Sequence, residues 1–343
     1  MATIKQIARR AEVSVGTVSN VLNDLPTVSK ESRASVLKAM EALGYQPSLL
    51  GRALRKHRTN MIVMVVPDIT NPFFPNVVRG AEDIAFKRGF RIVLCNSDND
   101  FSKEVAYIRE MLSYRPAGLI IVPSSLSRGL EEVKAYTKLG SSVVYLDRIP
   151  QKWAGDSVAS NHEEGAYAAT KFLIGLGHAR IATIAGPQTS PSGTARLAGF
   201  MRAMAEKGLK VDPSYVREAA EYLKPLGQEH ARELLKLKRR PTAIFAGNDL
   251  LAFGALAAIR ESGLHCPQDI SVIGFDNLDG GDDIAPSLST VDQSTYELGA
   301  MAAQIVVERA HGHKLAVRQE VFVPQLRIKE STAAPQSAAR SQA

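Results

Sequence analysis

Polar and charged side chains recur at the ends of short apolar runs in the second part of this sequence. The runs are rich in β-branched residues, as buried strands are. A sugar needs aromatic faces for its C–H surfaces and planar, bidentate partners for its neighbouring hydroxyl groups. The ligand-binding residues that we predict at these positions are Asn71, Phe73, Phe74, Asp147, Arg148, Ser190, Ser192, Arg196, Asn248, Asp276 and Gln293. Tyr222 is a further predicted ligand residue.

Each of these residues also has a purely structural interpretation. Asp or Asn after a strand often caps the next helix, and Phe73 and Phe74 could belong to a core. Six strand ends carry the same chemistry, however, and the ligands of open parallel sheets bind outside the carboxyl ends of the strands. This agreement favours a ligand site over coincidence.

The apolar runs alternate with helical segments from Met61 onward, which predicts an α/β fold of parallel sheets joined by crossovers. The runs are too numerous for one modest sheet. We therefore expect two lobes, roughly 61–160 and 162–290, with the C-terminal segments crossing between them inside one ligand-binding domain, 61–330. The stretch 331–343 is small, polar and aperiodic, so we expect a disordered tail.

The N-terminal segment has the pattern of two short helices joined by a tight turn. Thr3 and Ser14 are N-cap candidates, and the apolar positions after each recur at helical spacing. Two such helices over a small core predict a helix-turn-helix, whose second helix enters the major groove of DNA. A third helix is expected between Val28 and Leu43, with Val36, Leu37 and Met40 facing inward, and the headpiece as a whole spans 1–47.

The outer face of the second helix carries short polar side chains, as close approach to DNA requires. We expect Val15, Gly16 and Asn20 to read bases, and phosphate contacts from Ser14, Thr17, Ser19 and Asn23. Residues 1–60 hold ten basic and four acidic side chains, which is most of the net charge of +7. Such a basic segment suits a polyanionic partner.

The sequence motif T-I-K-x-I-A-R-x-A-x-V-S-x-x-T-V-S-x-V-L-N, at residues 3–23, resembles the headpiece of the LacI/GalR family of bacterial transcriptional regulators. Further matches to the family recur to about residue 330. The resemblance implies a two-lobed core like that of periplasmic sugar-binding proteins. It also implies a homodimer on a palindromic DNA operator, most often as a repressor, with an effector that alters DNA affinity. Heptad leucines are absent from the tail, which favours a dimer over a tetramer.

The same resemblance gives a role to 48–60, a segment that mixes apolar and basic residues. In the family the matching segment is a hinge helix that enters the minor groove and inserts a leucine between base pairs. Leu54 occupies that position, with Arg52 and Arg55 placed for phosphates or the minor groove. The alternative is that the leucines of this segment simply pack against the core.

The predicted ligand residues resemble the shell of ribose-binding proteins, residue type for residue type, which favours a monosaccharide effector. Three alternatives stay open. Purine-responsive relatives share Phe74 and Arg196, Arg148 and Arg196 could hold a sugar acid or phosphosugar, and a free cytosolic sugar receptor would need only the lobes. That last possibility leaves residues 1–60 without a role.

Several functions are not expected. The seven histidines lack metal-protease or Cys-His spacing, and neither a GxSxG elbow nor a phosphate-binding P-loop is present, so we expect no enzyme, catalytic residue, metal or cofactor. Cys95 and Cys266 lack CxxC spacing and are expected to be reduced packing residues. No signal peptide or long apolar run precedes the helix-turn-helix, so we expect a cytoplasmic protein without a membrane partner.

Overall fold

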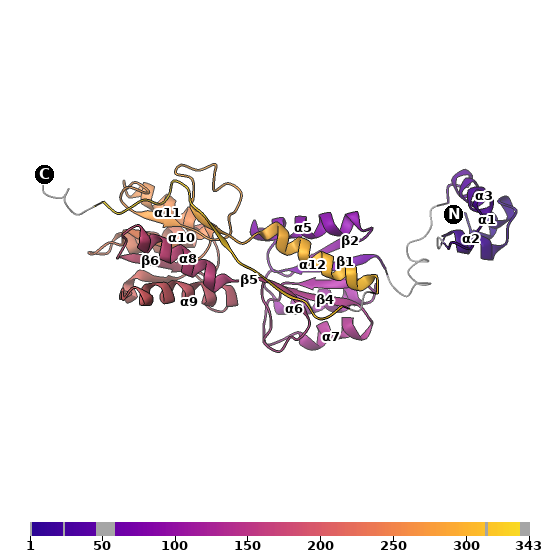
Figure 1. Cartoon of the computed structure of the whole chain (residues 1–343), viewed down its shortest axis with the longest axis horizontal. Coiled ribbons are helices and arrows are strands. Elements are labelled where there is room, and N and C mark those ends of the chain that lie inside the picture. Colours follow the sequence, from indigo (N-terminus) through magenta and orange to yellow (C-terminus); the bar gives the residue numbers. More distant parts are fainter. Residues whose placement is uncertain (1, 23–24, 46–58, 313–314, 337–343) are drawn as a thin grey trace.

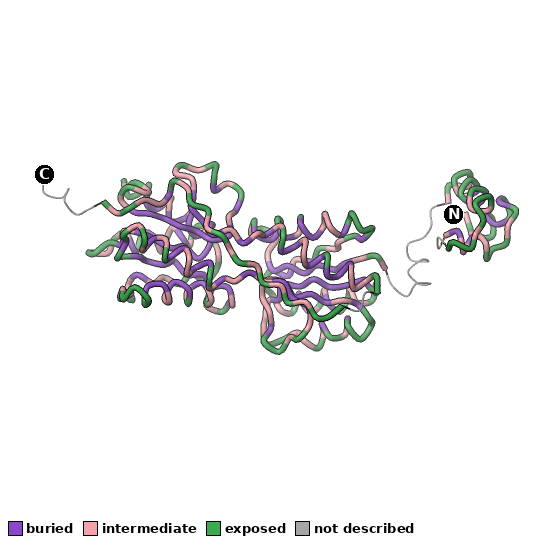
Figure 2. Tube along the Cα trace, in the orientation of Figure 1, coloured by how far each residue is buried: buried purple, intermediate pink, exposed green. Residues whose placement is uncertain are grey.

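The computed structural model describes residues 2–22, 25–45, 59–312 and 315–336. Within these ranges the chain forms a helical headpiece and an elongated α/β core of two lobes (Figure 1). The sheets are the most deeply buried parts of both lobes, and the helices turn one face to solvent (Figure 2).

The headpiece consists of α1 Ile4–Arg10, α2 Val15–Leu22 and α3 Lys30–Ala42. Thr3 and Gln6 form a capping box at the start of α1, and the Ser14 hydroxyl accepts a 3.0 Å hydrogen bond from the Thr17 amide at the start of α2. The predicted helix-turn-helix is therefore confirmed. The expected inward position of Leu37 is wrong, because this side chain is 52% exposed; Val36 and Ala39 are the buried residues of α3, and Met40 packs against the same core.

Lobe 1 is built on a six-stranded sheet of order β11-β5-β4-β3-β1-β2, and all of its neighbouring strands are parallel. Helices cover both faces, since alternate residues of β1 enter two different cores, one under α5 and α12 and one under α6 and α7. The elements are β1 Met61–Val66, α5 Phe73–Lys87, β2 Arg91–Asn96, α6 Phe101–Leu112, β3 Gly118–Ile121, α7 Leu130–Lys138, β4 Ser142–Leu146, β5 Asp156–Ser160, α12 Thr295–Ala310 and β11 Gln319–Phe322.

Lobe 2 is built on a four-stranded parallel sheet of order β7-β6-β8-β9. One face packs on α8 and α9 and the other on α10 and α11. The elements are α8 His162–Gly175, β6 Ile181–Ala185, α9 Pro191–Glu206, the 3-10 turn Pro213–Tyr215, β7 Val216–Glu218, α10 Lys224–Leu235, β8 Ala243–Ala246, α11 Asp249–Glu261 and β9 Ser271–Ile273.

Three segments of the described chain cross between the lobes, after β5, after β10 and after β11. Strand β10 Thr290–Asp292 pairs antiparallel with β12 Gln325–Arg327, so two of the crossings run side by side (Figure 1). The lobe boundaries predicted near 160 and 290 match these crossings. Helix α12 follows lobe 2 in the sequence but packs on lobe 1.

The tail does not begin where the sequence suggested. Ser331 is fully buried, its amide donates to the Ser287 carbonyl at 3.0 Å, and its hydroxyl donates to the Val272 carbonyl at 2.6 Å. The boundary at 330 is therefore too early, because a backbone that continues past β12 satisfies polar groups along the edge of lobe 2. Residues 337–343 lie outside the described chain, and no helix within it is long and apolar enough to cross a membrane.

Candidate functional site

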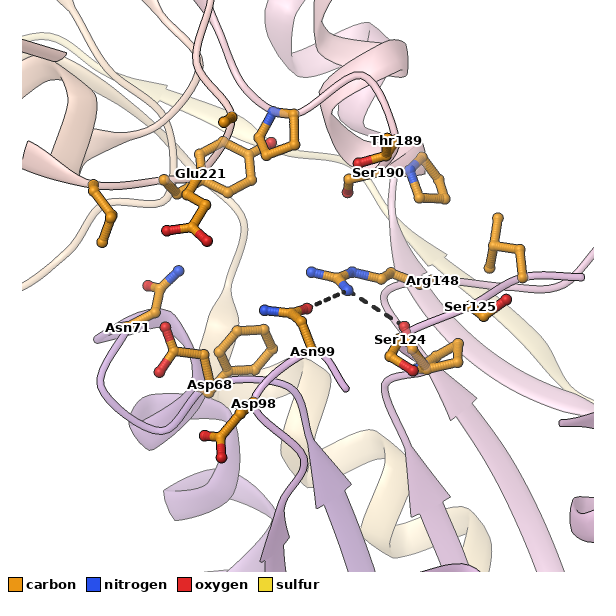
Figure 3. A pocket seen from close by; sticks show the side chains of 18 of the residues that line it. Asp68, Asn71, Asp98, Asn99, Ser124, Ser125, Arg148, Thr189, Ser190 and Glu221 are labelled. Carbon is orange, nitrogen blue, oxygen red and sulfur yellow. Dashed lines mark hydrogen bonds between the residues drawn. The ribbon is translucent and has the colours of Figure 1, made fainter. Parts of the chain in front are cut away.

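A cavity of about 710 Å³ lies between the two lobes, at the carboxyl ends of their strands. This volume lies within the usual range for small-molecule sites. Lobe 1 supplies Asp68, Asn71, Phe74, Asp98, Asn99, Ser124 and Arg148 to its lining, and lobe 2 supplies Thr189, Ser190, Glu221 and Tyr222. Figure 3 shows these side chains converging from both sides on an open centre.

The lobe 1 wall is held by local hydrogen bonds. The Asn71 side-chain oxygen accepts from the Phe73 amide at 3.1 Å, which orders the loop that enters α5. Arg148 donates to the Asn99 side chain at 3.2 Å and to the Pro123 carbonyl at 3.3 Å (Figure 3). Arg148 is thus positioned by the segments that follow β2 and β3, and it lines the cavity.

The lobe 2 wall combines hydroxyl groups with one aromatic ring. The Ser190 and Ser192 hydroxyls lie 2.8 Å apart at the start of α9. The Tyr222 ring lies 5.7 Å from the Arg196 guanidinium, and burial raises the pKa of the Tyr222 phenol. Gly186 leaves room for this ring, since a Cβ atom there would lie 2.3 Å from it.

Behind this wall, Arg196 is the centre of a buried polar network. Its side chain is 6% exposed, donates to the Gly247 carbonyl at 2.6 Å, and pairs with Asp276 at 3.1 Å. The guanidinium also lies 3.9 Å from the centre of the Phe275 ring. Gln293 donates to the same Asp276 oxygen at 2.5 Å. Burial raises the pKa of Asp276, although the charge of Arg196 opposes this shift.

Asp147 belongs to the same network from the lobe 1 side. It follows β4 with a φ of 63°, an uncommon backbone conformation for a residue other than glycine. Its carboxylate lies 3.0 Å from Nε2 of His162. Burial would raise the pKa of Asp147, but its interaction with His162 and the charges of Arg148 and Arg196 hold the pKa below the usual value.

Asp249 is a further buried carboxyl group, beside the network. It accepts from the Thr290 hydroxyl at 2.6 Å and from the Leu278 amide at 2.8 Å. Burial, followed by the nearby charge of Asp276, raises the pKa of Asp249 to about 8. A Cβ atom at Gly274 would lie 2.1 Å from the Asp249 carboxylate, so the close approach requires a glycine there.

The predicted ligand residues fall into three groups. The residues that line the cavity are Asn71, Phe74, Arg148, Ser190 and Tyr222. The residues in the buried layer, joined to that lining through Ser190 and Tyr222, are Asp147, Ser192, Arg196, Asp276 and Gln293. The residues with a structural position are Phe73, packed edge-on against Phe74 in the lobe 1 core, and Asn248, which caps α11.

Sequence reasoning missed several residues of the site. Asp98 and Asn99 follow β2 and Ser124 follows β3, so the strand-end rule that selected Asp147 could have found them. Glu221 follows β7, a short strand of Val, Arg and Glu that has no apolar run to mark it. His162 follows the equally polar β5, and nothing in its spacing marked it.

The expected DNA contacts lie on one side of α2. Ser14, Val15 and Gly16 are exposed, with 47% of Val15 open to solvent, while Thr17, Ser19 and Asn20 are half-buried. A Cβ atom at Gly16 would meet only the Ser14 hydroxyl, at 3.5 Å, so the fold does not require this glycine. Asn23, Arg52, Leu54, Arg55 and the expected hinge helix lie outside the described residues. In the described ranges no group of three acidic, His or Cys side chains could hold a metal ion.

This combination, a helix-turn-helix headpiece on a two-lobed core with a cavity between the lobes, defines a ligand-controlled DNA-binding protein. Residues 3–48 match the bacterial regulatory proteins of the lacI family, and residues 170–332 match a periplasmic binding protein-like domain. The HTH-type transcriptional repressor PurR of Photobacterium profundum is 35% identical over 331 residues, 96% of this chain and 98% of that protein. PurR of Pasteurella multocida is 36% identical over 90% of this chain and 92% of its own length.

Two solved structures extend the comparison. The lac repressor dimer bound to operator and the anti-inducer ONPF superimposes with a TM-score of 0.87 at 26% identity, covering 97% of this chain and 99% of that one. A LacI family regulator from Enterococcus faecium with bound ribose gives a TM-score of 0.70 at 30% identity, over 80% of this chain and 99% of that one. The chain belongs to the LacI family. It is a DNA-binding transcriptional repressor of that family, and its relatives are repressors rather than enzymes.

Proposed function

We propose that this repressor acts as a homodimer on a palindromic operator and that its effector is a neutral monosaccharide bound between the lobes. The observation that carries the ligand assignment is a set of buried polar atoms without hydrogen-bond partners. In the described chain these include Arg148 Nε, Arg196 Nε, Tyr222 Oη, Asn248 Nδ2 and Gln293 Oε1, all from predicted ligand residues.

Unpaired buried polar atoms cost about 1–3 kcal/mol each, so sites that keep them generally have a ligand or water to satisfy them. Among the residues of the lining and the buried layer, the unpaired set mixes donors on Arg148 and Arg196 with an acceptor on Gln293 and the hydroxyl of Tyr222. A hydroxyl group both donates and accepts, so a ring bearing several hydroxyls complements such a mixture. Phe74 lines the cavity from lobe 1 and Tyr222 from lobe 2, and both rings are suited to the C–H faces of the sugar ring.

The charge of the lining favours a neutral ligand over an anionic one. Asp68, Asp98 and Glu221 bring three carboxylates to the cavity, whereas Arg148 is the one basic residue among its described lining residues. An additional carboxylate or phosphate on the ligand would meet this acidic lining at close range. Sugar acids and phosphosugars are therefore weaker candidates than neutral sugars.

A purine is the second candidate, and the observation in its favour is the 34–36% identity to several repressors named PurR. Phe74 and Tyr222 could also enclose a flat base. The N–H donors of a purine base are fixed in the plane of its rings, however, whereas each hydroxyl group of a sugar can rotate to donate, so a base would leave more of the carboxylate and amide acceptors of the lining without partners. The acceptor-rich cavity therefore favours the sugar.

We assign operator recognition to the outer face of α2. Val15, Gly16 and Asn20 would read base edges, with Asn20 suited to bidentate pairing with adenine, while Ser14, Thr17 and Ser19 would hold phosphates. Asn23, Arg52, Leu54 and Arg55 keep their sequence-based assignments as DNA contacts. The effector would act by binding the two arrangements of the lobes with different affinity.

The test is a thermal-shift screen of the full chain with D-ribose, D-glucose, cellobiose, gluconate, ribose 5-phosphate, hypoxanthine and guanine. A ligand at about 100 times its dissociation constant adds roughly 2.7 kcal/mol to the folded state. We expect stabilisation by a neutral monosaccharide, together with a change in operator affinity measured by fluorescence anisotropy. Stabilisation by a purine alone would refute the sugar assignment.

A further inference from the structure

His162 joins the two lobes through its side chain as well as through its position in the chain. It is the first residue of α8, two residues after the end of β5, at the first crossing. The side chain is 7% exposed. Its Nε2 atom lies 3.0 Å from the Asp147 carboxylate of lobe 1, and its Nδ1 atom lies 3.3 Å from the Arg196 guanidinium of lobe 2.

Arg196 determines how these hydrogen bonds run. A guanidinium has donors only, so Nδ1 of His162 must accept. The imidazole is then neutral and carries its hydrogen on Nε2, which it donates to Asp147. The Arg196 nitrogen that contacts His162 also pairs with Asp276 at 3.1 Å. Arg196 therefore donates both to Asp276 in lobe 2 and to His162, and His162 donates in turn to Asp147 in lobe 1.

The backbone beside His162 is attached to another crossing. The Asn161 amide donates to the Phe322 carbonyl at 2.9 Å, at the end of β11, and the Asn161 side chain accepts from the Glu164 amide at 3.2 Å. The first turn of α8 also packs tightly on Phe275, since a Cβ atom at Gly165 would lie 2.8 Å from that ring. A displacement of His162 would therefore also move the backbone of two crossings, the one after β5 and the one after β11.

We propose that His162 is a positioning residue that couples ligand binding to the orientation of the lobes. The proposal rests on the proposed function only in placing the ligand against Arg196 and Asp147, and it holds for a sugar or a purine. A ligand that draws either group toward itself must rearrange a buried imidazole with no spare partner. Because an unmade buried hydrogen bond is costly, the lobes must move with the ligand contacts.

Two substitutions separate the two hydrogen bonds of the His162 bridge, one to Asp147 and one to Arg196. The amide of His162→Gln reaches the place of Nε2 and keeps a donor for Asp147, but it leaves Arg196 without its acceptor. The shorter His162→Asn keeps an acceptor near Nδ1 for Arg196 and loses Asp147. The matched control is His178→Gln, since His178 is also buried, with its ring nitrogens 2.9 Å from the Thr242 hydroxyl and 2.9 Å from the Ala333 carbonyl, all in lobe 2.

The experiment measures operator affinity of the full chain with and without saturating ligand, using D-ribose and hypoxanthine as the two probes. The readout is the ratio of the two operator dissociation constants, which weaker ligand binding does not change at saturation. We expect this ratio to fall about fivefold or more toward unity in both His162 variants. The His178→Gln variant should melt earlier and keep the wild-type ratio. A wild-type ratio in both His162 variants would overturn the proposal.

The outcomes separate this proposal from the sugar assignment. If the wild type responds to hypoxanthine and not to ribose, the sugar assignment fails and the same ratio, measured with hypoxanthine, still tests His162. If neither D-ribose nor hypoxanthine changes operator affinity, amide hydrogen exchange of the unliganded protein tests the role of His162 instead. Residues 147–162 should then exchange about tenfold faster in both His162 variants than in His178→Gln, because the bridge no longer restrains local opening. Equal rates would overturn the proposal.

Discussion

The headpiece and the core present their contact residues in opposite ways. The expected DNA contacts of α2 lie between Ser14 and Asn20 and are exposed or half-buried, whereas the ligand residues run from Asn71 to Gln293 and many are buried. The exposed face of one short helix is sufficient to contact the surface of a rigid DNA duplex. A small molecule must be surrounded, so its site needs several strand ends and a network that holds unpaired polar atoms in place.

The largest expected difference between the two regions is in their response to salt. Operator affinity should fall by about a thousandfold between about 50 and about 200 mM salt if the basic headpieces of a dimer together neutralise six or more phosphates. Affinity for a neutral sugar should change by less than about twofold, since no counterions are released. Parallel anisotropy and calorimetric titrations measure both, and a flat operator response would contradict the charge argument.

The next largest effect is expected from Arg196→Met, which keeps the apolar length of the side chain and removes the charge. The folded state should lose about 3–5 kcal/mol, because breaking a buried charge pair leaves Asp276 uncompensated. Ligand affinity should fall by about a hundredfold or more, because the polar network behind the cavity no longer holds Asp276 and Tyr222 in place. The control is Arg202→Met on the same helix, whose contacts to Glu163 and Glu164 are solvent-exposed. Equal losses of ligand affinity in both variants would mean that the network around Arg196 has no special role.

Asn20→Ala tests whether a single side chain of the headpiece contributes to operator affinity through a base contact. Loss of a bidentate base contact costs about 1–3 kcal/mol, so operator affinity should fall roughly 5- to 150-fold and base preference should relax at one position of each half-site. Ligand affinity should be unchanged. Leu37→Ala, on the exposed face of α3, is the control. A uniform loss over all operator variants would make Asn20 a phosphate contact instead.

The stability of the core should depend on pH through Asp249. Its pKa is about 8 in the folded chain and about 4 when unfolded, so the folded state holds an extra proton between these values. The favourable contribution is complete below about pH 4 and is lost as pH rises through about 8, at up to about 1.4 kcal/mol per pH unit. Asp249→Asn should flatten this dependence in melting curves. Parallel curves for the two proteins would show that Asp249 is ionised when folded.

The smallest effect separates the two ligand candidates. Tyr222→Phe removes an unpaired buried hydroxyl, so the unliganded protein should be at least as stable as wild type, while sugar affinity falls about five- to tenfold. Purine affinity should change little, because a stacked base uses the ring. Tyr215→Phe is the control, since its hydroxyl donates to the Arg239 carbonyl at 2.6 Å away from the cavity. That variant should lose stability and keep its ligand affinity.

The two regions also differed in how far the sequence predicted them. The caps Thr3 and Ser14 and the apolar stripe with Val18 and Val21 are local signals, so the headpiece helices followed from the sequence. Strand ends marked by an apolar run led to Arg148 and Asp276. His162 and Glu221 follow polar strands, and their roles depend on partners from distant segments. Phe73 shows the converse, because the strand-end rule cannot tell which of two adjacent rings faces the cavity.

The three crossings have a consequence for the order in which the chain can fold during synthesis. The four strands of the lobe 2 sheet are contiguous, from Ile181 to Ile273, but the lobe 1 sheet needs β11, which ends at Phe322. The sheet of lobe 1 therefore starts to emerge from the ribosome before the sheet of lobe 2 and is completed after it. Until then, the open edge of β5 and the apolar face that α12 will cover are exposed, so this half of the core is open to association with other chains during synthesis.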